Sequence, residues 1–205
     1  KGMRDQVILA SKALPTHHTP ASLRKSCEDS LRRLRTDYLD LYQLHWPCRE
    51  VSFSETWDTL LTLQREGKIR ELGVSNFGPQ DLNELMASGT PVSNQLCYNL
   101  LFRAVEYEIQ PLCVEHGIGI LCYSPLMQGL LTGKFSRGGG PGESRIMRTR
   151  SHLWQNAPWD ALEAYQVFCE ARGVTMLEAT FGWLLAQPGV ASVIAGATSP
   201  AQIEA

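Results

Sequence analysis

Several apolar segments of this chain end in polar or ionisable side chains. Lys12 follows "VILAS", His45 follows "LDLYQL", and Gln95 lies in "SNQLCYN". The full set is Lys12, His45, Ser75, Asn76, Gln95, Asn99, Tyr123, Ser124 and Thr198. An ammonium, an imidazole, a phenol ring and several amides and hydroxyls are groups that can polarise a carbonyl and hold a cofactor amide.

Lys12 and His45 carry most of this chemical interpretation. Desolvating an ammonium is costly, so a lysine at the end of a buried segment predicts a carboxylate partner or a catalytic purpose. The alternative is a side chain that extends its charge to solvent. Alternation in "LDLYQLHW" places His45 on one face with Leu39, Leu41 and Gln43. The alternative for His45 is a structural histidine with satisfied hydrogen bonds.

The elements that must position these groups are short strands alternating with amphipathic helices. Strands are predicted over residues 6–12, 39–46, 69–77, 92–99, 117–126 and 191–197. Helices are predicted over residues 19–35, 54–68, 79–87, 105–115, 160–173 and 175–189, with a last one from 199. Thr19 is the expected N-cap of the first helix, and Ser54 and Gly67 are the expected limits of the second.

The βαβα rhythm predicts parallel strands with right-handed crossovers. No G-x-G-x-x-G follows the first strand, which argues against an open dinucleotide-binding sheet. Polar residues at the C-terminal ends of six successive strands favour a (β/α)8 TIM barrel, whose sites lie at that rim. Six strands are fewer than eight, so the expected fold is an incomplete barrel forming one domain over residues 1–205.

One segment, residues 127–158, is longer than an ordinary loop and is expected to be functional or partly disordered. It contains Gly138–Gly142 and the basic residues Arg145, Arg148 and Arg150. These arginines are interpreted as a solvated basic loop, with a charged substrate or a cofactor phosphate as the alternative partner.

Composition excludes several classes of function. The net charge of −2 gives no electrostatic basis for binding nucleic acid or an anionic membrane, and no apolar run is long enough to span a bilayer. The six cysteines form no C-x-x-C pair, which predicts reduced thiols and a cytoplasmic protein. No zinc ligand set, phosphate-binding loop or nucleophile elbow is present, so no metal is expected.

Six motifs occur in order along the chain: "LASK", "LDLYQLHWP", "GKIRELGVSNF", "NQLCYN", "YSPLMQGLLTGK" and "IAGATSPAQIEA". In this order and spacing they resemble the aldo-keto reductase family over essentially all 205 residues. The resemblance implies a (β/α)8 oxidoreductase that transfers hydride from NADPH to an aldehyde or ketone. NADH stays an open alternative, because residues 196–205 contain no lysine or arginine to bind a 2′-phosphate.

The resemblance also implies a role for individual residues. Lys12 matches the lysine that lowers the pKa of the family's tyrosine acid, and His45 matches the histidine that orients the substrate carbonyl. The residues that match cofactor-binding positions are Ser75, Asn76 and Gln95 at the carboxamide, Tyr123 on the nicotinamide ring, Ser124, Leu126, Gln128 and Leu131 at the pyrophosphate, and Gly196, Thr198 and Gln202 at the adenosine phosphate. Trp46 and Phe77 match the substrate pocket.

The family's catalytic aspartate and tyrosine lie near its first two barrel strands, and neither has a counterpart in this sequence. The expectation is therefore a chain that lacks the first two βα units and has impaired or no reductase activity by itself. A non-catalytic, cofactor-binding partner subunit resembling the potassium channel β subunits is the alternative function. Open sheet edges would also offer a surface for oligomerisation.

Overall fold

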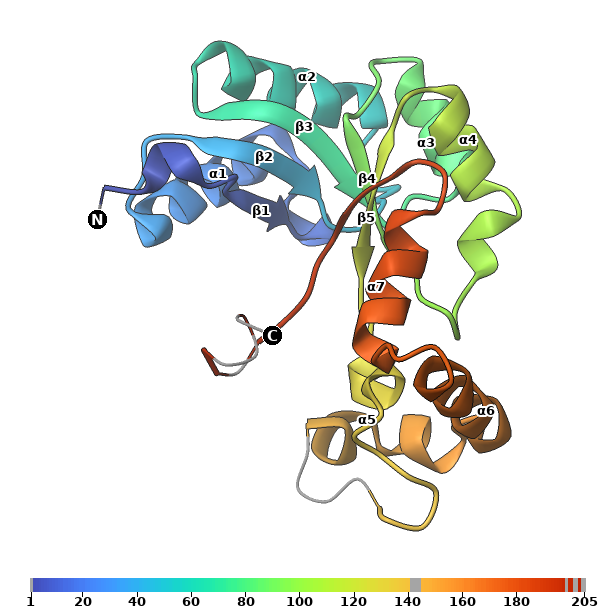
Figure 1. Ribbon diagram of the computed structural model, residues 1–205. Coiled ribbons are helices and arrows are strands. Elements are labelled where there is room, and N and C mark those ends of the chain that lie inside the picture. Colours follow the sequence, from blue (N-terminus) through green and yellow to red (C-terminus); the bar gives the residue numbers. More distant parts are fainter. Residues whose placement is uncertain (1, 141–144, 198, 201–202, 204–205) are drawn as a thin grey trace. The chain divides into compact units, whose positions relative to one another are not determined.

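The computed structural model describes residues 2–140, 145–197, 199, 200 and 203, which form two compact units. The first unit comprises Lys1–Leu96 and Glu106–Ile120, and the second comprises Cys97–Val105 and Leu121–Ala205. Helices and strands alternate along the first unit, whereas in the second several helices follow one another before the last strand (Figure 1).

The first unit contains the strands β1 (Ala10–Ala13), β2 (Leu39–Leu44) and β3 (Ile69–Ser75), and most of β4 (Ser93–Cys97). Its helices are α1 (Pro20–Leu34), α2 (Phe53–Arg65), α3 (Pro79–Met86) and α4 (Ile109–Glu115). Two 3-10 turns, Arg4–Gln6 and Pro15–His17, flank β1. Strand β5 (Gly119–Tyr123) begins in the first unit and ends in the second.

The second unit contains the 3-10 segment η4 (Met127–Thr132), the helices α5 (Arg145–Gln155), α6 (Trp159–Glu170) and α7 (Met176–Leu185), and β6 (Val190–Val193). A short turn, Ala104–Glu106, precedes α4. The segment 127–158 therefore carries η4 and α5, both of which the loop interpretation missed. Arg150 belongs to α5 and is exposed, and the side chains of Arg145 and Arg148 lie outside the described part.

The strands follow one another in the sheet in the order β1-β2-β3-β4-β5-β6. The β1–β2, β2–β3 and β3–β4 pairs are parallel. Six strands in sequential order, each separated from the next by helix, confirm the predicted α/β class. The order is that of a (β/α)8 barrel over six of its strands.

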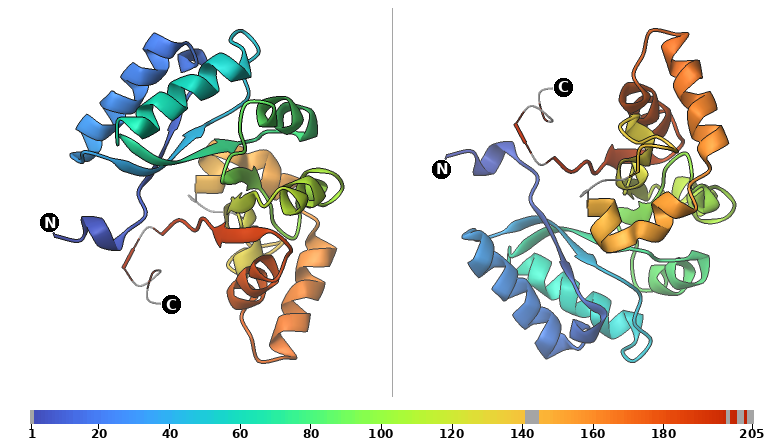
Figure 2. Two further views of the ribbon diagram at one scale, coloured as in Figure 1. Left: turned by 90° about the horizontal axis from the view of Figure 1, so that it is seen from above. Right: turned by 90° about the horizontal axis from the view of Figure 1, so that it is seen from below.

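Helices α1 and α2 lie side by side against the β1–β3 part of the sheet (Figures 1 and 2). Tyr42 on β2 points toward α1, because its hydroxyl lies 3.1 Å from Ser26 Oγ. Leu41 and Gln43 lie on the opposite face, where both side chains come within 3.0 Å of the position that a methyl group added at Gly73 of β3 would take. The predicted alternation of β2 is thus confirmed: the face of Leu41 and Gln43 is turned away from the helices.

The second unit has its own apolar core. Leu130 and Leu131 of η4 pack with Leu162 and Cys169 of α6 and with Met176 of α7. The apolar contacts of these buried side chains hold η4 against α6 and α7.

Element boundaries differ from the predictions in two informative places. Ser52, not Ser54, caps α2: its hydroxyl accepts from Glu55 N at 3.2 Å, and Phe53 is then the first helical residue and is buried. The first strand begins at Ala10, not residue 6, because Arg4–Gln6 turn as a 3-10 helix. The predicted Thr19 cap is confirmed.

Candidate functional site

A three-residue hydrogen-bonded cluster joins β1, β2 and β4 in the first unit. Lys12 Nζ donates to Gln95 Oε1 at 2.9 Å, and Gln43 Nε2 donates to the same oxygen at 3.1 Å. Gln43 and Gln95 are almost completely buried, with 1% and 7% of their surfaces exposed. Lys12 therefore has an amide oxygen as its partner and not the carboxylate that was one expectation, while the expected catalytic role of Lys12 stays a prediction.

Burial lowers the pKa of Lys12 below its usual value. An amide oxygen accepts a hydrogen bond but carries no negative charge to offset the cost of desolvating an ammonium. The ammonium of Lys12 is thus a stronger acid than that of a surface lysine.

His45 follows β2, and its backbone N–H donates to Ala13 O at 2.9 Å. Burial lowers the pKa of its imidazole, and the positive charge of Lys12 lowers it further. A histidine with a lowered pKa is neutral at pH 7 and keeps one ring N–H available as a donor. The neutral form is the one that can hydrogen-bond a carbonyl oxygen without transferring its charge.

Ser75 and Asn76 end β3 beside Gln95. Ser75 Oγ donates to Gln95 O at 3.0 Å, and Asn76 N donates to the same carbonyl at 3.0 Å. Asn76 has a left-handed backbone with φ of 61°, and its side-chain amide donates to His45 O at 3.0 Å. Left-handed non-glycine residues cost free energy and cluster at functional sites.

Gly73 allows the polar side chains of this face to pack closely. A methyl group added at Gly73 would lie 2.7 Å from Ser93 Oγ and 3.0 Å from Gln43 Cγ. Gly73 pairs with Gln43 in the β2–β3 register. A side chain at this position would therefore displace Gln43 or Ser93.

In the second unit, Tyr123 ends β5 and Ser124 begins an unusual turn. Ser124, Met127 and Gln128 all have left-handed backbones, with φ of 52°, 44° and 57°. Asn99 stabilises this turn by donating from Nδ2 to Ser124 O at 3.0 Å. Gln128 Nε2 also lies 3.3 Å from Ser124 Oγ. Left-handed non-glycine residues cost free energy and cluster at functional sites, so three of them in five positions make this turn a candidate binding loop.

The remaining predicted cofactor residues are placed as follows. Tyr123 is half-buried, and burial raises the pKa of its phenol. Leu126 is half-buried and accepts a backbone hydrogen bond from the buried Leu131. Gly196 is exposed, and Thr198 and Gln202 lie outside the described residues.

The two predicted substrate-pocket residues differ in exposure. Trp46 is 49% exposed, and its role in a substrate pocket stays a prediction. Phe77 is fully buried, and its ring lies 5.4 Å from that of Phe53. This is the arrangement of a core aromatic, and a pocket role for Phe77 stays a prediction.

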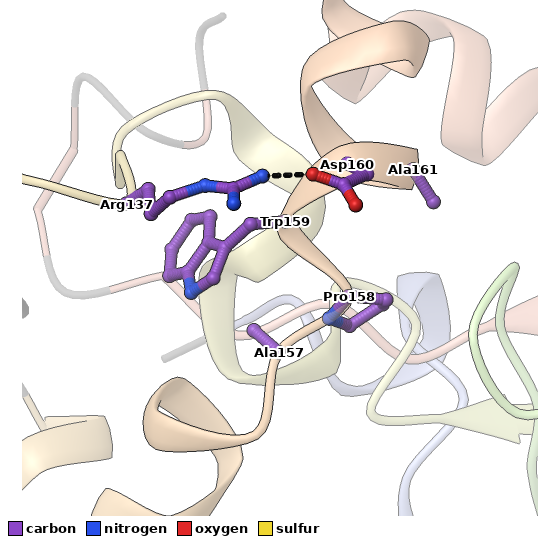
Figure 3. A pocket seen from close by; sticks show the side chains of 6 residues that line it. All are labelled: Arg137, Ala157, Pro158, Trp159, Asp160 and Ala161. Atoms are coloured by element: carbon purple, nitrogen blue, oxygen red, sulfur yellow. Dashed lines mark hydrogen bonds and ion pairs between the residues drawn. The ribbon is translucent and has the colours of Figure 1, made fainter.

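Two cavities among the described residues of the second unit have no predicted site residue in their lining. One, of about 360 Å³, is lined by Arg137 and by residues 157–161, and in it Arg137 is paired with Asp160 beside Trp159 (Figure 3). The other, of about 240 Å³, lies between Met127, Leu130 and α5. Neither contains a set of convergent buried polar groups.

Two residues of these networks were not among the predicted site residues. Gln43 lies at a position of β2 where the alternation predicts an apolar side chain. A glutamine at such a buried position could have identified it as a candidate site residue from the sequence. Asn99 was noted only as polar at a strand end, and its contact with Ser124 arises from folding.

Among the described residues, no helix has the length and hydropathy needed to cross a membrane. No group of three histidine, cysteine or acidic side chains in that part of the chain could hold a metal ion.

Known proteins resemble this chain over nearly its full length. It is 36% identical to the NADH-specific methylglyoxal reductase of Escherichia coli, covering 90% of this chain and 58% of that protein. It is 35% identical to the chloroplastic pyridoxal reductase of Arabidopsis thaliana, covering 94% and 57%. The structure of a Klebsiella pneumoniae aldo-keto reductase in complex with NADPH superposes with a TM-score of 0.77 at 34% identity, covering 99% of this chain and 64% of that one.

The chain thus spans roughly three fifths of the length of these relatives. The profile of the aldo/keto reductase family matches residues 1–205. With the sequential parallel strands and the ordered motifs, this match shows that the chain belongs to the aldo/keto reductase family.

Proposed function

We propose that this chain binds a nicotinamide dinucleotide and supplies Lys12 and His45 to an NAD(P)H-dependent reductase of aldehydes or ketones. The observation that carries the proposal is the Lys12–Gln95–Gln43 cluster beside His45, toward the C-terminal ends of the parallel strands β1, β2 and β4. Buried amides and an ammonium in such a position can hydrogen-bond a polar ligand at the rim of the barrel.

The predicted residues suit different parts of a nicotinamide dinucleotide. The amides of Asn76 and Gln95 and the hydroxyl of Ser75 match the hydrogen-bonding groups of a carboxamide. The ring of Tyr123 can stack on nicotinamide, and the strained turn from Ser124 through Leu126 and Gln128 to Leu131 suits a pyrophosphate. Gly196, Thr198 and Gln202 are proposed for the adenosine end. When bound, the cofactor supplies the hydride.

The chain's own residues would prepare the carbonyl. Neutral His45 would donate a ring hydrogen bond to the carbonyl oxygen and hold it in place. Lys12 would contribute a positive charge next to that oxygen, where negative charge develops. Trp46 would form part of the wall of the substrate pocket. Phe77 would join it in a conformation that exposes its ring to the substrate.

NADPH is the preferred cofactor in this proposal, and NADH is the alternative. The Klebsiella relative is described in complex with NADPH, whereas the Escherichia coli relative is named as NADH-specific. Relatives named for methylglyoxal and pyridoxal reduction make a small aldehyde the first substrate to try.

The test is a titration of the purified protein with NADPH and NADH, followed by the quenching of tryptophan fluorescence. Saturable binding of either is expected, and binding of neither would overturn the proposal. Methylglyoxal-dependent oxidation of the bound cofactor would establish reduction. Binding without turnover of any aldehyde or ketone would point to a non-catalytic cofactor-binding subunit.

Three broader properties belong to the same proposal. We propose that residues 1–205 form part of a single barrel domain, since the family profile matches them without a break. We propose a cytoplasmic protein, because all six cysteines are free thiols. Association through sheet edges is proposed as well, and the molar mass in solution tests it.

A further inference from the structure

We infer that Gln43 is a positioning residue: it holds the Gln95 amide so that Gln95 presents its Nε2 donor, not its oxygen, to the carboxamide of a bound nicotinamide. This inference rests on the proposed function, because it concerns how the proposed cofactor is recognised. It is carried by the three-residue cluster of the first unit.

The orientation of the Gln95 amide follows from the chemistry of its neighbour. An ammonium has three donors and no acceptor, so the Gln95 atom 2.9 Å from Lys12 Nζ must be the oxygen. The Gln43 atom 3.1 Å from the same oxygen must then be a donor, which identifies it as Nε2. Lys12 therefore sets the orientation of both amides.

Gln43 is the rigid member of the cluster. Its side chain is 99% buried and packs against Gly73, where its Cγ lies 3.0 Å from the position of an added methyl. Lys12 has a long flexible side chain and is only half-buried. Two donors on one oxygen, one of them immobile, restrict rotation of the Gln95 amide far more than the lysine alone.

The remaining donor of Gln95 is left for a ligand. Within the described residues, Gln95 Nε2 donates to no other group, whereas its oxygen accepts two hydrogen bonds. A carboxamide offers one carbonyl oxygen that can accept from this donor. Gln43 thus acts on the cofactor without touching it.

The burial of Gln43 is costly in the folded chain, which suggests a functional reason for it. Gln43 Oε1 is a buried acceptor without a partner in the described residues. An unpartnered buried acceptor destabilises the folded state, because it loses its hydrogen bonds to water and gains none in the protein. Gln43→Leu removes this acceptor together with the donor, so we expect its stability to match or exceed that of the wild type.

The first experiment compares two ligands on the same variant. Gln43→Leu and Gln43→Met are titrated with NADP⁺ and with 2′-phospho-ADP-ribose, which lacks the nicotinamide. NADP⁺ should bind about tenfold more weakly, the factor for one well-placed hydrogen bond. The truncated ligand should bind as it does to the wild type. Gln110→Leu, which removes another buried glutamine from α4, is the matched control and should change neither affinity.

The second experiment tests the orientation. The 3-acetylpyridine analogue of NADP⁺ keeps the carbonyl oxygen and lacks the amide NH₂. Gln43→Leu should weaken this analogue by the same factor as NADP⁺. An effect on NADP⁺ alone would mean that Gln95 accepts from the NH₂, and would overturn the assigned orientation.

The outcomes also separate this inference from the proposed function. If the wild type binds neither NADP⁺ nor NAD⁺, the proposed function fails, and this inference fails with it. If the wild type binds and Gln43→Leu binds NADP⁺ equally well, only the inference about Gln43 is wrong. Equal weakening of NADP⁺ and 2′-phospho-ADP-ribose would show general damage to the fold and would also overturn it. For an NADH-specific protein, NAD⁺ and ADP-ribose replace the phosphorylated pair.

Discussion

The charge of Lys12 influences the protonation of His45, and this effect can be tested at the scale of single residues. Burial is the main reason that the pKa of His45 is lowered, and the Lys12 charge is the second. Lys12→Met removes the positive charge near His45 and leaves His45 as buried as before. The pKa of His45 should therefore rise in the variant and stay below its ordinary value, as measured by NMR titration of the imidazole protons. An unchanged pKa would show that the two side chains are electrostatically independent.

Gly73 tests the close packing on the same face of the sheet. Gly73→Ala brings a methyl group to 2.7 Å from Ser93 Oγ and should destabilise the fold by roughly 1–3 kcal/mol, the usual cost of overpacking. Urea unfolding measures the loss. Gly138→Ala, whose added methyl meets nothing within 4 Å, is the control. Adding Ser93→Ala to Gly73→Ala should recover part of the stability, and no recovery would contradict the proposed clash.

At the scale of the element, the start of α2 distinguishes two serines two positions apart. Ser52 Oγ accepts from Glu55 N at 3.2 Å, whereas Ser54 lies inside the helix. Ser52→Ala should destabilise the protein by about 1 kcal/mol, the typical value for an N-cap. Ser54→Ala should be neutral or slightly stabilising, because alanine has the higher helix propensity. The thermal unfolding temperatures of the two variants distinguish the two caps. A larger loss of stability in Ser54→Ala than in Ser52→Ala would support Ser54 as the N-cap, as predicted from the sequence.

Strand β2 shows why an element was predictable while its polar residue was not. Its alternation gives Leu41, Gln43 and His45 one face from sequence alone. The partner of Gln43 lies 52 positions away on β4. Only the parallel register of three strands determines which side chain meets it.

For the whole molecule, His18 predicts how stability depends on pH. The side chain is 1% exposed, and burial lowers its pKa to about 4. The unfolded chain takes up this proton near pH 6.5 and the folded chain only near pH 4, so stability falls as pH falls between these values. The loss is on the order of 2 kcal/mol once partial solvation is allowed for.

His18→Leu should remove most of this loss, and unfolding by urea at several pH values between 6.5 and 4.5 measures it. His116→Leu, at an exposed position, should keep the wild-type slope. Carboxylates act at lower pH: Arg24 and Lys68 lower the pKa of Glu66 to about 2, so its contribution is lost only below about pH 4.5. An identical slope in the wild type and His18→Leu would contradict the assignment.

The sequence by itself determined the alternation of strands and helices and the polar strand ends, because both follow from the local spacing of apolar and polar residues. It also determined the family, which follows from the order of the motifs. It also determined the Thr19 cap, which depends on residues three positions apart. It did not determine the Ser52 cap or the helix within 127–158, where local signals compete.

Tertiary structure alone decided that Lys12, Gln43 and Gln95 share one oxygen. Lys12 and Gln95 are 83 positions apart, and no local pattern relates them. The physical reason is that a parallel sheet brings its strand ends together through register, which is set by long-range pairing and burial. Residue types could suggest a site at that edge, while the partner of each side chain depended on the folded sheet.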